Sequence, residues 1–358
     1  MKGLVFLTGT TGQLGSYLAE LYLADDHKVI GLKRRTSTDN LWRLKDCIEN
    51  PNFSLVEGDI TDFGSIFQII QQNRPDRIIN AAAMSHVHTS FSQPNYTFDV
   101  VAKGPLNLLE SIRLLKSDNY NPRFATFSSS EMFGDQFDNH NPFDGSSSDK
   151  NIQHEQTKMN PKSPYAVAKL AAFQLGKIYR EAYGIWVTNP ILFNSESSRR
   201  GENFVTRKIT KWIGDYLRWK KKCHFDTCGL EFTDNTIISD IGYEFPKLKL
   251  GNINSYRDWS YAEDTARGVK LALEYKNPTE FIFATGETHT IKEFVELAFS
   301  LVNLNWKDYV TIDKDLFRPS EVKYLCGDSS KARQLLGWQS TVSFKELVSM
   351  MVKSDAEV

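Results

Sequence analysis

Two residues near the middle of the chain could act together in proton transfer. Tyr165 and Lys169 lie in the stretch Ser163-Pro-Tyr-Ala-Val-Ala-Lys169, and in a helix this spacing puts both side chains on one face. A phenol has a pKa of about 10 and is a poor base at neutral pH, but a nearby ammonium lowers that pKa. Tyr165 beside Lys169 is therefore a candidate base, although an amphipathic helix with an ordinary tyrosine has the same spacing.

A hydroxyl and a carboxylate, Ser129 and Glu131, follow a stretch that is predicted to be a strand. In an open α/β sheet the carboxyl ends of the strands face the ligand crevice. Ser129 could hydrogen-bond the oxygen that Tyr165 deprotonates. Glu131 adds a second base, which abstraction of a proton next to a carbonyl needs and a plain alcohol oxidation does not. Taken alone, Glu131 could equally be a solvated acid at the end of a strand.

The start of the chain carries a glycine-rich turn between a predicted strand and a predicted helix. Its residues are Gly9, Thr10, Thr11, Gly12, Gln13, Leu14 and Gly15. Glycines let the backbone approach a pyrophosphate, which then rests on the N-terminus of the helix. The spacing resembles that of extended short-chain dehydrogenases/reductases. The turn therefore predicts a bound dinucleotide, the alternative being a glycine-rich loop without a ligand.

Cations follow the second predicted strand, in Gly31-Leu-Lys-Arg34-Arg35. An acid at this place would accept the ribose 2′-hydroxyl of NAD, whereas guanidinium groups bind the 2′-phosphate of NADP. Arg34 and Arg35 therefore favour NADP over NAD, with a solvated basic turn as the alternative. Further cofactor contacts are predicted after the third and fourth strands, at Asp59, Ile60, Ala81, Ala82 and Ala83.

The elements that must hold these groups alternate between strand and helix. Amphipathic stretches such as Gln13 to Leu23 and Leu106 to Leu115 have the length and period of helices. Repeated strand–helix units imply right-handed crossovers and an α/β fold with a doubly wound, Rossmann-like parallel sheet. Short apolar runs predict its buried strands at Gly3 to Thr8, Lys28 to Leu32, Phe53 to Glu57, Arg77 to Asn80, Arg123 to Ser128 and Trp186 to Ile191.

The alternation breaks after residue 192. We expect residues 1–192 to form the dinucleotide-binding domain, with later segments returning to it, and residues 193–358 to form mainly a smaller substrate lobe. Residues 216–247 are poorly periodic and are predicted to be an insertion, and the polar residues 135–160 a surface loop. Helical patterns return at Tyr261 to Glu274, Ile291 to Leu301 and Phe344 to Val352.

The composition sets limits on partners and location. The 358 residues are 41% hydrophobic and carry a net charge of −1, so nothing favours nucleic acid or an acidic membrane as a partner. No apolar run is long enough to span a membrane, and no export signal is expected. Four scattered cysteines fit a reduced, cytoplasmic setting. Cys223, His224 and Cys228 match no zinc spacing, so no metal site is expected.

Nearly from end to end, the chain resembles the GDP-mannose 4,6-dehydratase family. The family's signature after the fifth strand appears as Ser129-Ser-Glu131, and its phenol–lysine segment as Pro161 to Lys169. The stretch Asn194 to Ile209, NSESSRRGENFVTRKI, is the most specific match, to a loop that contacts the nucleotide-sugar and a second subunit. Shorter motifs match at residues 250–259, 318–321 and 327–338.

The resemblance implies roles for particular residues. Ser129, Glu131 and Tyr165 would be catalytic, and Lys169 would contact the cofactor. Further cofactor contacts would come from Ser85, Tyr96 and Ser195, and from Arg200, which could reach a neighbour's cofactor across a tetramer interface. A homo-oligomer, either a tetramer or a dimer, is therefore expected. The GDP-sugar would be held by Ser85, Asn194, Val205, Lys208, Arg257, Arg318 and Glu321.

Three residues depart from the family pattern. Ser129 stands in place of a threonine and keeps the hydroxyl, Met84 replaces a glutamine and Ser195 replaces a histidine. These departures leave the sugar open, with GDP-heptose as an alternative to GDP-mannose. A C4 epimerase or dehydrogenase of the same fold would not need Glu131, and a regulatory NADP-binding module would not need the Tyr–Lys pair. We expect an NADP-dependent lyase that performs 4,6-dehydration of a GDP-sugar.

Overall fold

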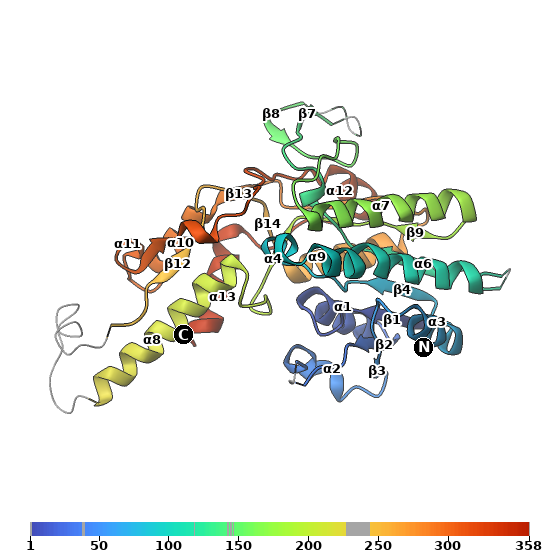
Figure 1. Ribbon diagram of the computed structural model, residues 1–358, viewed down its shortest axis with the longest axis horizontal. Helices are drawn as coiled ribbons and strands as arrows, with labels where there is room; N and C mark the ends of the chain where they lie inside the picture. The colour runs from blue at the N-terminus through green and yellow to red at the C-terminus, as the bar shows by residue number, and fades with distance from the viewer. Residues whose placement is uncertain are drawn as a thin grey trace. The chain divides into compact units, whose positions relative to one another are not determined.

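The computed structural model describes residues 2–37, 40–117, 119–141, 143, 145, 147–226 and 244–357. The chain forms two compact units, whose elements are labelled in Figure 1. The first unit comprises Met1–Ser195, Arg257–Thr288 and Arg318–Val342, so two late segments belong with the N-terminal part. The second comprises Glu196–Tyr256, His289–Phe317 and Ser343–Val358. That the second unit serves mainly as a substrate lobe stays a prediction.

The first unit is built on a six-stranded parallel sheet. Its order is β3-β2-β1-β4-β5-β9, and the order reverses between β1 and β4. This reversal is the doubly wound arrangement, in which ligands bind outside the carboxyl ends of the strands. The predicted α/β fold with a doubly wound sheet is confirmed. The strands are β1 (Leu4–Thr8), β2 (Lys28–Lys33), β3 (Phe53–Glu57), β4 (Arg77–Asn80), β5 (Arg123–Thr126) and β9 (Val187–Thr188).

Helices cover both faces of this sheet. Val5 and Phe6 are neighbours on β1 but belong to different cores, because successive side chains of a strand point to opposite faces. The core around Val5 includes residues of α1 (Gln13–Ala24), α2 (Lys45–Ile48) and α9 (Ala262–Glu274). The core around Phe6 includes residues of α3 (Phe63–Asn73), α6 (Gly104–Leu115) and α7 (Pro164–Tyr183).

Two predicted strands are each divided in the structure. The stretch predicted from Trp186 to Ile191 forms β9 and β10 (Ile191–Leu192), with Pro190 between them. Proline has no N–H to donate to a ladder, which explains the break. The stretch predicted from Arg123 to Ser128 likewise forms β5 and β6 (Ser128–Ser129). β6 and β10 join β15 (Ile282–Phe283) in a second, three-stranded parallel sheet.

The surface loop predicted at residues 135–160 contains two short strands, so the expectation that it has no regular structure was wrong. β7 (Asp138–His140) and β8 (Ser147–Ile152) pair antiparallel, as the labels in Figure 1 show. Gln153 N donates to the carbonyl of Cys326, and Asp328 N donates to the carbonyl of Gln153. Hydrogen bonds rather than apolar packing hold this segment, and apolar periodicity does not report such bonds.

In the second unit, α8 (Val205–Asp226) packs against α10 (Ile291–Ser300) and α13 (Phe344–Ala356). The helices predicted near α9, α10 and α13 are confirmed. The insertion predicted at residues 216–247 stays a prediction, and in the structure α8 continues through its first part to Asp226. Residues 227–243, which include Cys228, lie outside the described part of the chain.

Short elements complete the two units. In the second, β12 (Leu248–Leu250) pairs in parallel with β17 (Val310–Ile312). Within the described residues, no helix is long and apolar enough to cross a membrane. The remaining helices and strands are α4 (Val87–Ser92), α5 (Pro94–Phe98), β11 (Asn194–Glu196), β13 (Tyr256–Arg257), β14 (Trp259–Tyr261), β16 (His289–Thr290), α11 (Trp306–Tyr309) and α12 (Ser330–Leu336).

Candidate active site

The glycine-rich turn lies at the switch point of the sheet, between β1 and α1. Gly9 has a φ of +66°, and a Cβ there would lie 2.6 Å from backbone atoms of Ala81 and Ala82. A Cβ at Gly15 would lie 2.1 Å from the carbonyl oxygen of Gly9. Gly12, the N-cap of α1, has no side chain to occupy the first amides of the helix. The turn thus leaves close backbone access and helix N–H groups of the kind that bind a diphosphate.

A chain of buried hydrogen bonds fixes this turn to two neighbouring strands. Thr8 Oγ1 donates to Asn80 Oδ1 at 2.7 Å, and Asn80 Nδ2 donates to Thr126 Oγ1 at 3.0 Å. Ala82 N donates to Thr8 Oγ1 at 3.3 Å, which places residues 81–83 beside the turn. These polar residues end three adjacent strands. Their shared position was a signal that sequence reasoning missed.

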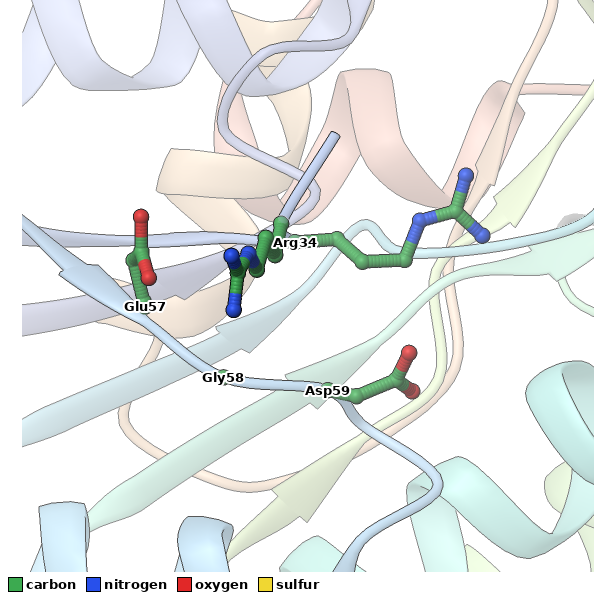
Figure 2. A pocket seen from close by; sticks show the side chains of 5 residues that line it. Arg34, Glu57, Gly58 and Asp59 are labelled. Carbon is green, nitrogen blue, oxygen red and sulfur yellow. The ribbon is translucent and has the colours of Figure 1, made fainter. Parts of the chain in front are cut away.

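A pocket of about 560 Å³ lies where β2 and β3 end. Figure 2 shows the side chains of Arg34 and Asp59 extending in the same direction, away from Glu57. Arg34 donates a hydrogen bond to the hydroxyl of Tyr96, so two predicted cofactor residues that are far apart in sequence meet. Asp59 Oδ1 accepts from the N–H and the hydroxyl of Thr61, which fixes that carboxylate. The pocket is lined by Arg34, Arg35, Glu57, Gly58 and Asp59.

Arg43 is a further cation beside the glycine-rich turn. Its Nη1 donates to the carbonyl oxygen of Thr11 at 3.2 Å. Its Cζ lies 4.1 Å from the centroid of the Trp42 ring, a cation–π contact that holds the guanidinium in place. Sequence reasoning missed Arg43, because an arginine in a short 3₁₀ turn carries no characteristic spacing.

Tyr165 and Lys169 lie in the first two turns of α7. The helix begins where the Ser163 hydroxyl accepts from Ala166 N at 3.1 Å, which is an N-cap. Lys169 Nζ lies 5.8 Å from the centroid of the Tyr165 ring and donates to the carbonyl oxygen of Phe127 at 2.6 Å. Both side chains are buried, and burial lowers the pKa of Lys169 to about 8. The Lys169 ammonium can therefore lose its proton within about one pH unit of neutrality.

Ser129 and Glu131 lie beside the same helix. Ser129 ends β6, Glu131 lies on the 3₁₀ turn Ser130–Met132, and α7 packs against both elements. Glu131 N donates to Ser129 Oγ at 3.3 Å. Both residues are only 9% exposed. The structure thus gathers the four predicted catalytic residues where β6 and its following turn meet α7.

Two arginines contact the carboxylates of Glu131 and Glu321. Arg318 Nη1 lies 3.5 Å from Glu131 Oε1, and Arg257 Nη2 lies 3.4 Å from Glu321 Oε1. Arg257 is almost fully buried, and desolvation lowers its pKa, while Glu131 and Glu321 act in the opposite direction. Guanidinium groups in this position can bind a diphosphate.

The stretch at Asn194 joins the two ends of this site. Gln13 Nε2 donates to the carbonyl oxygen of Ser195 at 2.8 Å, which links the stretch to the glycine-rich turn. Asn194 N donates to the carbonyl oxygen of Asp258 at 3.1 Å, next to Arg257. Ser85, in contrast, has an exposed side chain.

Three predicted ligand residues, Arg200, Val205 and Lys208, belong to the second unit. Arg200 lies over the Phe204 ring, with its Cζ 3.6 Å from the centroid, and its Nε is 3.2 Å from Glu196 Oε2. Desolvation lowers the pKa of Lys208, opposed by Asp313. These contacts lie within the second unit and fix the orientation of the Arg200 side chain.

Comparison with known proteins decides the family. The family model described as GDP-mannose 4,6 dehydratase matches residues 6–227 and 229–351. The chain belongs to this family. GDP-mannose 4,6 dehydratase 1 of Arabidopsis thaliana is 42% identical over 364 residues, which cover 100% of this chain and 91% of the plant protein. The resemblance found in the sequence motifs is therefore confirmed.

Solved structures share the fold of this family member at low identity. A dTDP-glucose 4,6-dehydratase from Bacillus anthracis in complex with NAD gives a TM-score of 0.76 at 18% identity, covering 99% of this chain and 96% of that one. A UDP-glucuronic acid 4-epimerase from Bacillus cereus gives 0.78 at 20% identity and covers 99% of both chains. Because a dehydratase and an epimerase share this backbone, the choice of reaction depends on side chains.

Proposed function

We propose that the protein catalyses the 4,6-dehydration of GDP-mannose to GDP-4-keto-6-deoxymannose. Membership of the GDP-mannose 4,6-dehydratase family supports this reaction. The observation that carries the proposal is Glu131, a second base beside the helix that bears Tyr165 and Lys169. A dehydrogenase or an epimerase needs one base at C4, whereas elimination of water needs another at C5.

In the proposed mechanism Tyr165 takes the proton of the sugar 4-hydroxyl, while Ser129 hydrogen-bonds the same oxygen. A nicotinamide cofactor held at the glycine-rich turn would supply reversible hydride transfer, from C4 and back to C6, so that the sugar undergoes no net oxidation. The C4 ketone acidifies the C5 hydrogen, which Glu131 removes. Glu131 then gives that proton to the 6-hydroxyl, which leaves as water. C5 takes a proton from solvent and Tyr165 releases its own to solvent, so the protons balance. Lys169 keeps the phenol acidic through its charge.

The cofactor is proposed to be NADP. The turn around Gly9 and Gly15, where a Cβ would collide with the backbone, suits the diphosphate of a dinucleotide. Arg34 and Arg35 line the pocket that follows β2, and no acid ends that strand. Guanidinium groups there favour a 2′-phosphate. Ile60, residues 81–83 and Ser195 would complete the contacts.

The proposed substrate site lies at the other end. Arg257 and Arg318 would bind the diphosphate of the GDP-sugar, and Asn194 and Glu321 its hydroxyl or base groups. The contact of Arg318 with Glu131 supports this assignment, because the sugar would then lie next to the base. Ser85, Val205 and Lys208 are also proposed to contact the GDP-sugar.

We also propose that the protein works as a homo-oligomer, either a tetramer or a dimer. Arg200 is oriented by Glu196 and Phe204, as a residue reaching toward a neighbouring subunit's cofactor would need to be. Light scattering on the wild-type protein and on Arg200→Ala should show an oligomer that the substitution weakens. An active wild-type monomer at working concentration would contradict the proposal.

The reaction is tested by incubating the purified protein and NADP with GDP-mannose, a GDP-heptose and dTDP-glucose in parallel. Mass spectrometry should show a product lighter by one water from GDP-mannose, with no net gain of NADPH absorbance. A product of unchanged mass would indicate an epimerase, and an oxidised product with equal NADPH a dehydrogenase. Water loss from the heptose alone would correct the substrate but keep the reaction.

A further inference from the structure

A fully buried carboxylate lies directly behind the proposed diphosphate site. Asp258 follows Arg257 and has no exposed surface. Its Oδ1 accepts from the N–H and the hydroxyl of Thr285 at 2.8 and 2.7 Å. Its Oδ2 accepts from Gly286 N at 3.0 Å and Gly327 N at 3.2 Å. Every one of these four partners is a donor, so the site is built for an acceptor-only group, the ionised carboxylate.

Asp258 connects the three stretches that carry the proposed GDP-sugar residues. Its backbone carbonyl accepts from Asn194 N at 3.1 Å. Gly327, held by the carboxylate, closes the stretch that bears Arg318 and Glu321. Arg257 is its neighbour in sequence and contacts Glu321. β11, which begins at Asn194, pairs with β14, which follows Asp258 directly. Within the described residues, no strand pairing joins these two strands to the stretch from Arg318 to Gly327, and the Asp258 carboxylate supplies the bond to Gly327.

We propose that Asp258 is a positioning residue for the GDP-sugar: it holds Asn194, Arg257 and the stretch from Arg318 to Gly327 in the arrangement that receives the diphosphate. This inference rests on the proposed function of those residues. Asp258 itself is buried and acts through them. Replacement by asparagine would turn one oxygen into an N–H₂ group that faces donors, so the bonds on that side would be lost.

Asp264 offers a matched control. It is also buried, and its carboxylate accepts from the N–H and the hydroxyl of Thr341 at 2.7 and 2.8 Å and from Arg267 at 2.7 Å. These bonds anchor the segment that follows α12 and include no residue assigned to the GDP-sugar. Asp264→Asn should therefore cost a similar amount of stability without changing the affinity for GDP.

The test is calorimetric titration of the full-length wild type, Asp258→Asn and Asp264→Asn with GDP and, separately, with NADP. Asp258→Asn should bind GDP about tenfold more weakly or worse, roughly a loss of 1.4 kcal/mol, and bind NADP as the wild type does. Asp264→Asn should bind both ligands as the wild type does. Equal GDP affinity in the two variants would overturn the proposal.

A milder pair of variants decides the matter if Asp258→Asn does not fold. Thr285→Val removes the hydroxyl bond to Asp258, together with the bonds of that hydroxyl to the backbone of Glu287. Thr341→Val removes the corresponding bond to Asp264. The first should weaken GDP binding by a few fold and the second should not. Equal GDP affinities in this pair would overturn the inference. A wild type that binds no GDP would instead contradict the proposed function itself.

Discussion

The two ends of the candidate site are built in different ways. At the cofactor end, the glycine-rich turn, Arg34, Asp59 and residues 81–83 each follow a strand of one parallel sheet. At the sugar end, Asn194 and Arg257 lie on short strands outside that sheet. Within the described residues, the stretch that bears Arg318 and Glu321 pairs with neither strand, and it is bonded to Asp258 through Gly327. The difference teaches that a regular sheet brings ligand residues together by topology, whereas irregular stretches depend on a buried polar residue.

This comparison predicts that substitutions at the two ends affect the binding of different ligands. Substitutions at the cofactor end should change dinucleotide binding and leave GDP binding intact, and the reverse should hold at the sugar end. Residues between the ends, on β6, its following turn and α7, should change the chemistry while both ligands still bind.

The largest effect is expected for Tyr165→Phe, between the two ends. The variant lacks the base for the first step, so turnover should fall by roughly 10²–10⁴-fold or more. Steady-state kinetics with GDP-mannose measures the loss, and titration with GDP and NADP should give wild-type affinities. A variant that turns over like the wild type would show that Tyr165 is an ordinary core tyrosine.

Lys169 should give opposite pH trends in stability and activity. Its folded pKa of about 8 lies below the ordinary value of 10.5, so between these values the unfolded chain binds more protons. The free energy of unfolding should therefore gain up to about 3 kcal/mol from this group as pH rises from 8 to 10.5. Turnover should fall over the same range, because the charge that assists Tyr165 is lost.

Urea unfolding of the wild type and of Lys169→Met at pH 8 and pH 10 isolates this contribution, since other groups titrate alike in both proteins. The stability of the wild type should rise relative to that of the variant. A constant difference between the two would contradict the lowered pKa.

Arg35→Ala tests the cofactor end. Arg35 is exposed, so we expect its loss to cost the lower end of the range for a hydrogen-bonded charge pair. NADP binding should weaken by about 2 kcal/mol, and the binding of NAD and of GDP should stay almost unchanged. Lys33→Ala is a control, because this residue of the same basic run does not line the pocket. Fluorescence titration measures both dinucleotides. An equal loss of affinity for NADP and NAD would show that this pocket does not bind the 2′-phosphate.

The smallest effect is expected for Thr126→Val. This residue belongs to the chain of hydrogen bonds that runs through Asn80 to Thr8 at the cofactor end. The variant leaves Asn80 Nδ2 without its buried acceptor, which should lower the free energy of unfolding by about 1–2 kcal/mol. NADP affinity should stay near that of the wild type, because the sheet still positions the turn. Thermal unfolding and titration measure the two quantities. A large loss of NADP affinity would mean that hydrogen bonds, not topology, hold this end.

The cofactor end and the sugar end also differ in how much of each could be predicted from the sequence. The turn around Gly9 and the pair at Tyr165 are local patterns, so the strand, the helix and the spacing were readable directly. Arg257 and Arg318 were found only through the resemblance to a family. The four bonds of Asp258 and the contact of Arg43 with the turn join residues distant in sequence without periodicity, and no local pattern encodes them.

The most direct test of the central claim is a single turnover of Glu131→Gln with GDP-mannose and NADP. This substitution keeps the shape of the side chain and removes the base proposed for C5. The account predicts that NADPH absorbance appears and persists, that no water is lost, and that C5 takes up no deuterium from deuterated water. Dehydration by Glu131→Gln at the wild-type rate would contradict the account.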